Sequence, residues 1–241
     1  MKKQTLDRIL QSQGFGTRKG CQQLINDGDV LVNGEPASGY KLPLDPTGMV
    51  LTVFDEEWPV REHVYLVLNK PSNIECSRKP SHHPGVHTLL PEQFLWRDVQ
   101  PVGRLDHDTT GMLLLSDDGA FIHTQGHPKH HQNKVYVATL KHEVDESLVA
   151  QLLDGVQLID EPAPIAALAA RLIDPLHVEM TLDQGKYHQV KRMLAAAGNR
   201  CEALVRSQIG GLTLASLGLA EGEWCYLDDE MLARLNQNDA A

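Results

Sequence analysis

A nine-residue segment bounded by two glycines, residues 103–111 (Gly-Arg-Leu-Asp-His-Asp-Thr-Thr-Gly), constrains this chain more than any other feature. Four apolar residues follow it, and Asp117-Asp118-Gly119 then indicates a tight turn, so a buried strand is predicted over residues 112–115. Glycine lets the backbone turn sharply or approach a ligand closely. The polar side chains between the glycines therefore lie at the edge of a hydrophobic element, where they need partners or a function.

Residues 103–111 resemble the catalytic motif of the pseudouridine synthases, with Asp106 at the position of the family's essential aspartate. The resemblance implies isomerisation of a uridine in RNA. That reaction gains and loses no atoms, so we expect no cofactor. A carboxylate could attack the ribose, add to the base or remove a ribose proton, and the sequence leaves these three roles open.

An ionised Asp106 in a closed pocket needs a nearby cation, because burial disfavours the charged form. Arg104 shares a face with Asp106 if the segment is extended, but the resemblance implies that Arg104 enters the RNA where the flipped nucleotide was. Lys191 is the better partner, because residues 185–193 resemble the family's third motif, whose basic residue pairs with the aspartate. Taken alone, that stretch predicts a helix over residues 188–197 with Lys191 and Arg192 in solvent.

A strand with alternating polarity is predicted over residues 135–140, with Lys134, Tyr136 and Ala138 on one face. The family has Lys-x-Tyr here, which implies that Tyr136 stacks on the uracil of an extruded nucleotide. An ordinary strand tyrosine is the alternative. Residues 68–71 (Leu-Asn-Lys-Pro) match the family's first motif, which supports the active-site sheet.

The N-terminus has the pattern of a separate module. A short apolar stripe at helical spacing ends at the glycines of residues 14–16, and Thr17 can cap a second helix that ends at Gly28. Asn33-Gly34 then predicts a two-residue hairpin turn. This order resembles the small RNA-binding domain named for ribosomal protein four of the small subunit. The residues expected to bind RNA, here and near the other motifs, are Arg104, Arg8, Arg18, Lys19, Lys134, His188 and Arg192.

The length of 241 residues fits two domains, which we expect over residues 1–60 and 61–241. Short alternating strands with few helices between them predict an α+β fold with a largely antiparallel sheet, and the resemblance implies a mixed sheet with the cleft across its middle. Strands are expected at residues 50–54, 65–68, 112–115, 135–140, 177–182 and 201–205, and helices at 146–153, 188–197 and 228–235.

A formal net charge of −10 opposes binding to RNA unless the positive charge is gathered in one place. We expect such a polarised surface, because acidic residues concentrate in residues 221–241 while Lys and His gather near the motifs. The four scattered cysteines fit reduced thiols in a cytoplasmic protein, here expected as a monomer. No apolar run reaches the roughly 20 residues that a membrane span requires.

Twelve histidines raise the alternative of a metal site, as in a metal-dependent hydrolase. His83 and His87 have i, i+4 spacing, but the zinc-peptidase signature is absent, and Pro128 breaks any helix through the dense cluster at residues 127–131. We therefore expect no metal. His130 and His131 are expected to contact phosphate or to cap a loop.

Two features favour one branch of the family. Residues 185–193 and the pair His130-His131 resemble the branch named RsuA, which modifies 16S ribosomal RNA, whereas large-subunit relatives tend to have Asn-Arg-Gln in place of residues 187–189. The expected partner is 16S RNA in an assembling small subunit. A synthase for 23S RNA and a non-catalytic RNA-binding assembly factor are the alternatives, although the latter would not need Asp106, Tyr136 and Lys191 together.

Overall fold

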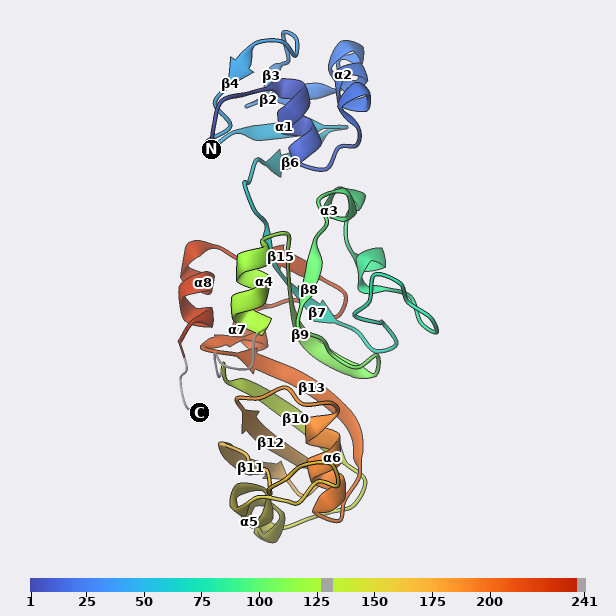
Figure 1. The fold of residues 1–241 in the computed structure, drawn as a ribbon, viewed down its shortest axis with the longest axis vertical. Coiled ribbons are helices and arrows are strands. Elements are labelled where there is room, and N and C mark those ends of the chain that lie inside the picture. Colours follow the sequence, from blue (N-terminus) through green and yellow to red (C-terminus); the bar gives the residue numbers. More distant parts are fainter. Residues whose placement is uncertain (127–131, 238–241) are drawn as a thin grey trace. The chain divides into compact units, whose positions relative to one another are not determined.

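The computed structural model describes residues 1–126 and 132–237, and the chain forms two compact units (Figure 1). The first unit contains residues 1–64 together with residues 87–100 and 116–118. The second contains the remaining described residues from Tyr65 onward. Two segments that come after residue 61 in sequence are thus grouped with the N-terminal residues, and the domain boundary near residue 60 stays a prediction.

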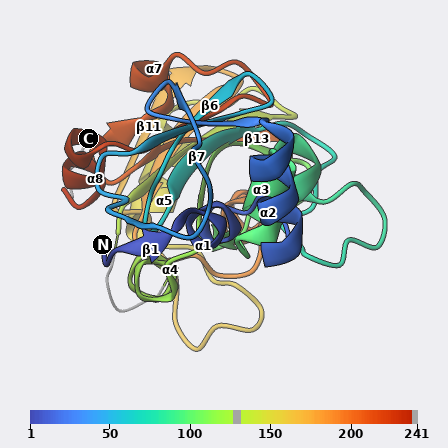
Figure 2. The same ribbon diagram turned by 90° about the horizontal axis from the view of Figure 1, so that it is seen from above.

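The first unit has the predicted order of helix, helix and hairpin. Helices α1 (Leu6–Ser12) and α2 (Arg18–Asp27) lie side by side in Figures 1 and 2. The hydroxyl of Thr17 accepts the amide hydrogen of Gly20 (3.2 Å), and Gly28 ends α2 with a φ of 85°, as the sequence predicts. The sheet has the order β3-β2-β5-β6, with the strands β2 (Val30–Val32), β3 (Glu35–Pro36), β5 (Val50–Val53) and β6 (Glu56–Pro59).

The turn between β2 and β3 is formed by Asn33 and Gly34, whose φ angles of 51° and 83° suit a two-residue hairpin. A short pair of strands, β1 (Gln4–Thr5) and β4 (Pro43–Leu44), and the helix α3 (Glu92–Trp96) complete the unit. The core under the sheet contains Leu6, Ile9, Leu10, Cys21, Ile25, Val30, Met49, Leu51, Val53 and Val60. The apolar stripe of α1 is therefore buried in its own unit.

The second unit is built on one mixed sheet with the order β11-β12-β10-β13-β9-β7-β15. Its strands are β7 (Tyr65–Lys70), β9 (Thr109–Ser116), β10 (Lys134–Leu140), β11 (Ala169–Asp174), β12 (His177–Leu182), β13 (Cys201–Ile209) and β15 (Trp224–Tyr226). Strand β13 is parallel to β9 and antiparallel to β10. Two short strands, β8 (Gln100–Val102) and β14 (Leu212–Thr213), pair with β9 and β13. The predicted α+β class with a mixed, mostly antiparallel sheet is confirmed.

The helices of the second unit are α4 (Gly119–Gly126), α5 (Glu146–Asp154), α6 (Gln189–Ala196), α7 (Leu214–Leu217) and α8 (Asp229–Leu235), with one 3₁₀ turn at Val86–Leu89 grouped partly with each unit. The helices expected at residues 146–153, 188–197 and 228–235 are present. Strand β11 and helix α4 were not expected from the sequence. Within residues 1–126 and 132–237, no helix combines the length and apolar character that a bilayer crossing requires.

One position in the sheet fixes the start of the motif strand. Gly111 lies in β9 with a φ of 96°, and a Cβ atom there would come 2.4 Å from the backbone oxygen of Arg206 on β13. Only glycine allows the two strands to approach so closely. The second glycine of the motif is therefore required by the sheet itself, and it lies five residues after Asp106.

Candidate active site

A buried lysine, Lys70, anchors the loop that carries Asp106 through hydrogen bonds to backbone oxygens. Lys70 ends strand β7 and is fully buried, and its Nζ donates hydrogen bonds to the backbone oxygens of Pro71 (2.9 Å), His107 (3.1 Å) and Thr109 (2.8 Å). Burial lowers the pKa of the Lys70 ammonium, and the three carbonyls satisfy its three donors. The backbone on both sides of Asp108 is thereby fixed to the end of the sheet.

Asp106 lies between two basic side chains of helix α6 and its N-cap. Lys191 Nζ is 3.2 Å from Asp106 Oδ2, and His188 Nε2 is 3.1 Å from Oδ1. Lys191 also donates to Asp108 Oδ1 at 2.6 Å. The Asp106 side chain is nevertheless 28% exposed. The carboxylate is paired on one side and still accessible on the other.

Lys191 keeps its charge at this site. Burial opposes the ammonium form, but the hydrogen bond to Asp108 and the charge and hydrogen bond of Asp106 outweigh it and raise the pKa of Lys191. In the same pair, burial opposes the carboxylate of Asp108, and the hydrogen bond from Lys191 lowers its pKa. One lysine therefore serves two carboxylates of the motif.

The residues at the N-terminus of helix α6 position His188 and Lys191 beside Asp106. Gln189 Oε1 accepts the amide hydrogen of Lys186 (3.0 Å), and His188 adopts a left-handed conformation with a φ of 46° as the N-cap. The His188 ring stacks on the ring of Tyr187, with centroids 3.9 Å apart. The apolar face of α6 contains Val190, Met193 and Leu194, all buried, so the helix is amphipathic as predicted, but Lys191 is only 23% exposed rather than solvated.

A pocket opens beside the carboxylate. Its lining includes the charged residues Asp106, Arg104 and Lys191, the ring of Tyr136, and the apolar side chains Leu105, Leu182, Val190 and Leu204. Tyr136 comes from β10 and is 8% exposed. The pocket thus combines one carboxylate, several basic side chains, an aromatic ring and a mixed polar and apolar lining, to which Gln184 and Gln189 also contribute.

Two further cations lie next to Tyr136. Arg206, on β13, is directly opposite Tyr136 in the sheet, is 4% exposed, and donates from Nε to the backbone oxygen of Met112 (2.7 Å). Lys134, two residues before Tyr136, donates to the backbone oxygen of Gln132 (2.8 Å). Burial, followed by repulsion from Arg206, lowers the pKa of Lys134 to about 8. Both line a small pocket that shares Arg104 and Tyr136 with the first.

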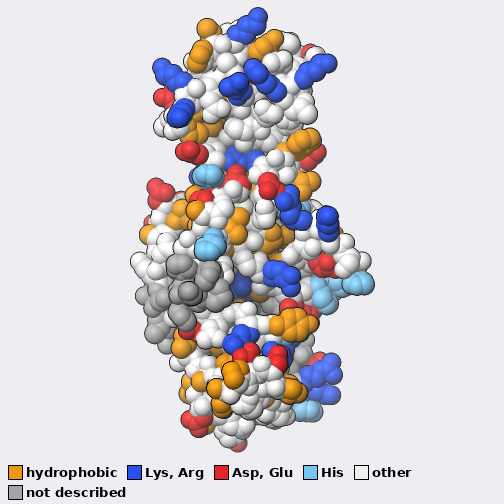
Figure 3. Space-filling view, in the orientation of Figure 1, with side chains coloured by type: hydrophobic (Ala, Val, Ile, Leu, Met, Phe, Trp, Pro, Cys, Tyr) orange, Lys and Arg blue, Asp and Glu red, His pale blue; other side chains and the backbone are white. Residues whose placement is uncertain are grey.

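The remaining residues expected to bind RNA lie in different surroundings. Arg192 is held away from Asp106 by an ion pair with Asp160 and a hydrogen bond to the backbone oxygen of Tyr187. In the first unit, Arg8 and Lys19 are exposed, and Arg18 pairs with Asp7 at 2.7 Å. On the face that Figure 3 displays, Lys and Arg side chains are spread over this unit. His130 and His131 lie outside the described residues.

Sequence reasoning missed the specific role of Lys70, although it assigned residues 68–71 a supporting function. The available signal was a lysine directly after an apolar run, where a cation must find acceptors if it is buried. It assigned His188 to RNA contacts, which stays a prediction, and did not foresee that His188 Nε2 lies 3.1 Å from Asp106 Oδ1. Within residues 1–126 and 132–237, no three His, Cys, Asp or Glu side chains are grouped so that they could hold a metal ion.

Comparison with known proteins agrees with this geometry. The family model for RNA pseudouridylate synthase matches residues 64–196, and the model for the S4 domain matches residues 4–50. The ribosomal small subunit pseudouridine synthase A of Yersinia pestis is 37% identical over 95% of this chain and 96% of its own length. An uncharacterized RNA pseudouridine synthase of Bacillus subtilis, YtzG, is 34% identical over 98% of this chain and 99% of its own. A crystal structure of a pseudouridylate synthase superposes with a TM-score of 0.67 at 33% identity, over 96% of this chain and 99% of that one.

The chain therefore belongs to the RNA pseudouridine synthases, isomerases that here carry an N-terminal S4 domain. Within that family it is of the type of ribosomal small subunit pseudouridine synthase A, to which the Escherichia coli enzyme of that name, 36% identical over 95% of this chain, also belongs. The resemblance drawn from residues 103–111 is confirmed.

Proposed function

We propose that this protein converts one specific uridine of 16S ribosomal RNA into pseudouridine, with Asp106 as the essential carboxylate. The observation that carries the proposal is the position of Asp106, which is paired with Lys191 and His188 yet remains open to a pocket that contains Tyr136. A carboxylate that has basic partners but is not enclosed suits attack on the ribose, addition to the base and removal of a ribose proton alike.

The chemistry needs little else. The bond between N1 of uracil and C1′ of ribose breaks, the base rotates, and C5 becomes bonded to C1′; the proton lost from C5 is balanced by the one gained at N1. Tyr136 supplies a flat surface on which the extruded uracil stacks, in place of the neighbours it lost in the RNA. The apolar walls formed by Leu182 and Leu204 limit water around the detached base.

The choice of 16S RNA as substrate rests on the relatives from Yersinia pestis and Escherichia coli, which are both named for the ribosomal small subunit. The exposed Arg8 and Lys19 of the S4 domain would contact RNA phosphates, and Arg104 at the mouth of the pocket would fill the place of the flipped nucleotide. Extruding a uridine costs a few kcal/mol, and less where the surrounding helices are still open. We therefore expect a partly assembled small subunit to be a better substrate than naked 16S RNA or a finished subunit.

Two experiments test the proposal. In the first, the protein is incubated with 16S RNA, 23S RNA or partly assembled small subunits in the presence of a chelator and without cofactor, and pseudouridine is mapped. In the second, the gene is deleted and both ribosomal RNAs are mapped. Loss of a single pseudouridine from 16S RNA is the expected result. Loss only from 23S RNA would overturn the substrate, and no conversion of any RNA would overturn the proposed activity.

A further inference from the structure

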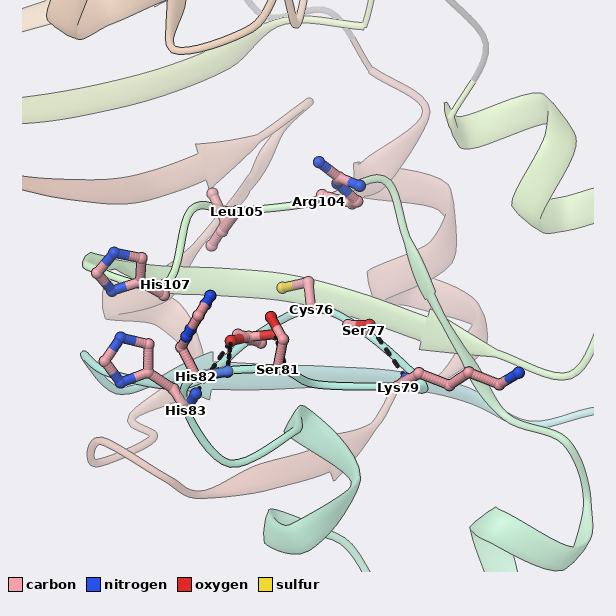
Figure 4. A pocket seen from close by; sticks show the side chains of 10 residues that line it. Cys76, Ser77, Lys79, Ser81, His82, His83, Arg104, Leu105 and His107 are labelled. Atoms are coloured by element: carbon pink, nitrogen blue, oxygen red, sulfur yellow. Dashed lines mark hydrogen bonds between the residues drawn. The ribbon is translucent and has the colours of Figure 1, made fainter.

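A pocket of about 530 Å³, distinct from the small pocket lined by Lys134 and Arg206, lies beside the active-site pocket (Figure 4). The two share the wall formed by Arg104 and Leu105, which line both. Beyond that wall the motif divides, because Asp106 lines the active-site pocket and His107 lines the second one. One loop, residues 104–107, therefore contributes to the lining of both pockets.

The far side of this second pocket is a loop that one carboxylate holds in shape. Glu75 accepts the amide hydrogens of Ser81 (3.0 Å), His82 (2.8 Å) and His83 (3.0 Å). These three hydrogen bonds lower the pKa of Glu75 to about 2. Glu75 is the one acidic residue among the described residues that line the pocket, and its oxygens are already occupied by backbone donors. The loop that lines the pocket is thus held in shape, and the Glu75 carboxylate faces the backbone amides of that loop.

The two ends of the pocket differ in chemistry. At one end, the rings of His83 and His107 stack with centroids 4.4 Å apart and an angle of 19° between their planes. At the other end lie the side chains of Lys79 and Arg104, as Figure 4 shows. Between them is Cys76, whose thiol pKa is raised by burial, so it is neutral. A flat aromatic surface at one end and cations at the other match the base and the phosphate of a nucleotide.

We propose that this pocket binds the nucleotide next to the target uridine, with its base against the His83–His107 pair and its phosphate near Lys79 and Arg104. The inference rests on the proposed function, because it places the target uridine at Asp106. The RNA chain is continuous, so the neighbouring nucleotide must lie directly outside the active-site pocket, and the shared Arg104–Leu105 wall puts this pocket there. The pocket then contributes to the choice of uridine through the identity of its neighbour.

The test uses an RNA fragment that spans the mapped uridine and carries the fluorescent base 2-aminopurine, in two versions, immediately before or immediately after that uridine. Stacking quenches its fluorescence. With the wild-type protein we expect quenching at one of the two positions. His83→Phe keeps a flat ring and should keep the quenching, whereas His83→Ala should lose it and raise the RNA concentration for half-saturation about tenfold. The single-turnover rate at saturating RNA should be unchanged, because His83 does not line the active-site pocket.

A matched control and a second substrate complete the design. His142 is an exposed histidine far along the chain that lines neither pocket, so His142→Ala should behave as wild type. An RNA without a base at the quenched position should bind wild type and His83→Ala equally. Lys79→Ala should reduce the slope of log affinity against log salt by about one on either RNA.

The outcomes distinguish the two levels of the argument. If the fragment is converted to pseudouridine but neither 2-aminopurine position is quenched, or if His83→Ala weakens the normal and the base-free RNA alike, the inference is wrong and the proposed function stands. If His83→Ala does not fold, the comparison of normal with base-free RNA on the wild-type protein decides the question. If the wild type converts no RNA, the proposed function itself fails.

Discussion

Two aspartates, one in each unit, show how the same side chain is used in opposite ways. Asp7 in the S4 domain has no exposed surface and accepts hydrogen bonds from the side chains of Thr5, Arg18 and Gln22 and from the amide of Arg8. Asp106 in the synthase unit is also paired with cations, but 28% of its side chain is exposed and it lines a pocket. Both carboxylates have basic partners, and only one has an open face.

The difference separates a structural carboxylate from one available for chemistry. Burial opposes ionisation of Asp7, but the hydrogen bonds from Thr5, Gln22 and Arg18 outweigh it and lower its pKa to about 2. The hydrogen bonds from Arg18 and Gln22 join α1 to α2, and those from Thr5 and Arg8 stay within α1 and its N-cap. Asp106 has two partners on α6 and its N-cap, which leaves oxygen lone pairs for a substrate. A charged pair alone therefore does not identify an active site. At Asp106 the pair is accompanied by an accessible face and by a pocket that also contains Tyr136, as the proposed role of this carboxylate requires.

The strongest test of this contrast is Asp106→Asn. The amide keeps the shape of the side chain but cannot act as a nucleophile or a base, so turnover should fall by about 10²–10⁴-fold while RNA binding and thermal stability persist. Single-turnover pseudouridine formation measures the rate. Asp108→Asn is the matched control and should cost much less, because Asp108 contacts Lys191 from the more exposed side. More than a few per cent of wild-type turnover in Asp106→Asn would contradict the assignment.

The next largest effect is expected for Lys191. Replacing it with Met removes the side chain that lies 3.2 Å from Asp106 and 2.6 Å from Asp108, so Asp106 is positioned less well and the single-turnover rate should fall by about tenfold to 10²-fold. Lys191→Arg should retain most of the activity, since it restores a cation at this position. Single-turnover rates at saturating RNA test both variants. An unchanged rate for Lys191→Met would mean that the pair does not contribute to the reaction.

Asp7→Asn should have the converse phenotype. Removing the charge weakens the bonds from Arg18 and Gln22 and should lower the free energy of unfolding by about 2 kcal/mol, with turnover at saturating RNA unchanged. Because the folded pKa lies below the ordinary value of 3.8, this stabilisation is present above about pH 4 and is lost as the pH falls toward 2. Urea unfolding at pH 7 and pH 3, followed by Trp fluorescence, measures it. Asp27→Asn, an exposed site on α2, is the control, and equal destabilisation by both variants would contradict the comparison.

The sequence predicted most of the fold and the composition of the site, but not its geometry. Periodicity and caps located α1, α2 and the hairpin at Asn33-Gly34, because these depend on local rules. Strand β11 was missed because its side chains are mostly half-buried or exposed and follow no clear alternation. The pairing of Lys191 with Asp106 came from family resemblance, since 85 residues separate them and only the fold brings them together. The bond from Lys191 to Asp108, the position of His188 and the buried Lys70 depend on that packing.

The smallest expected effect concerns Lys134, which contrasts with the saturated Asp7 by having a single backbone acceptor. Its pKa of about 8 means that the cation is present below pH 8 and is lost as the pH rises through it. If Lys134 attracts an RNA phosphate, wild-type affinity should fall a few-fold more than that of Lys134→Arg between pH 7 and pH 9, because arginine stays charged. Lys141→Arg, at an exposed site, controls for the change of residue type, and the RNA's own titration cancels in the ratio of affinities. Parallel pH profiles for wild type and Lys134→Arg would show that Lys134 is held for packing beside Tyr136 and not for RNA.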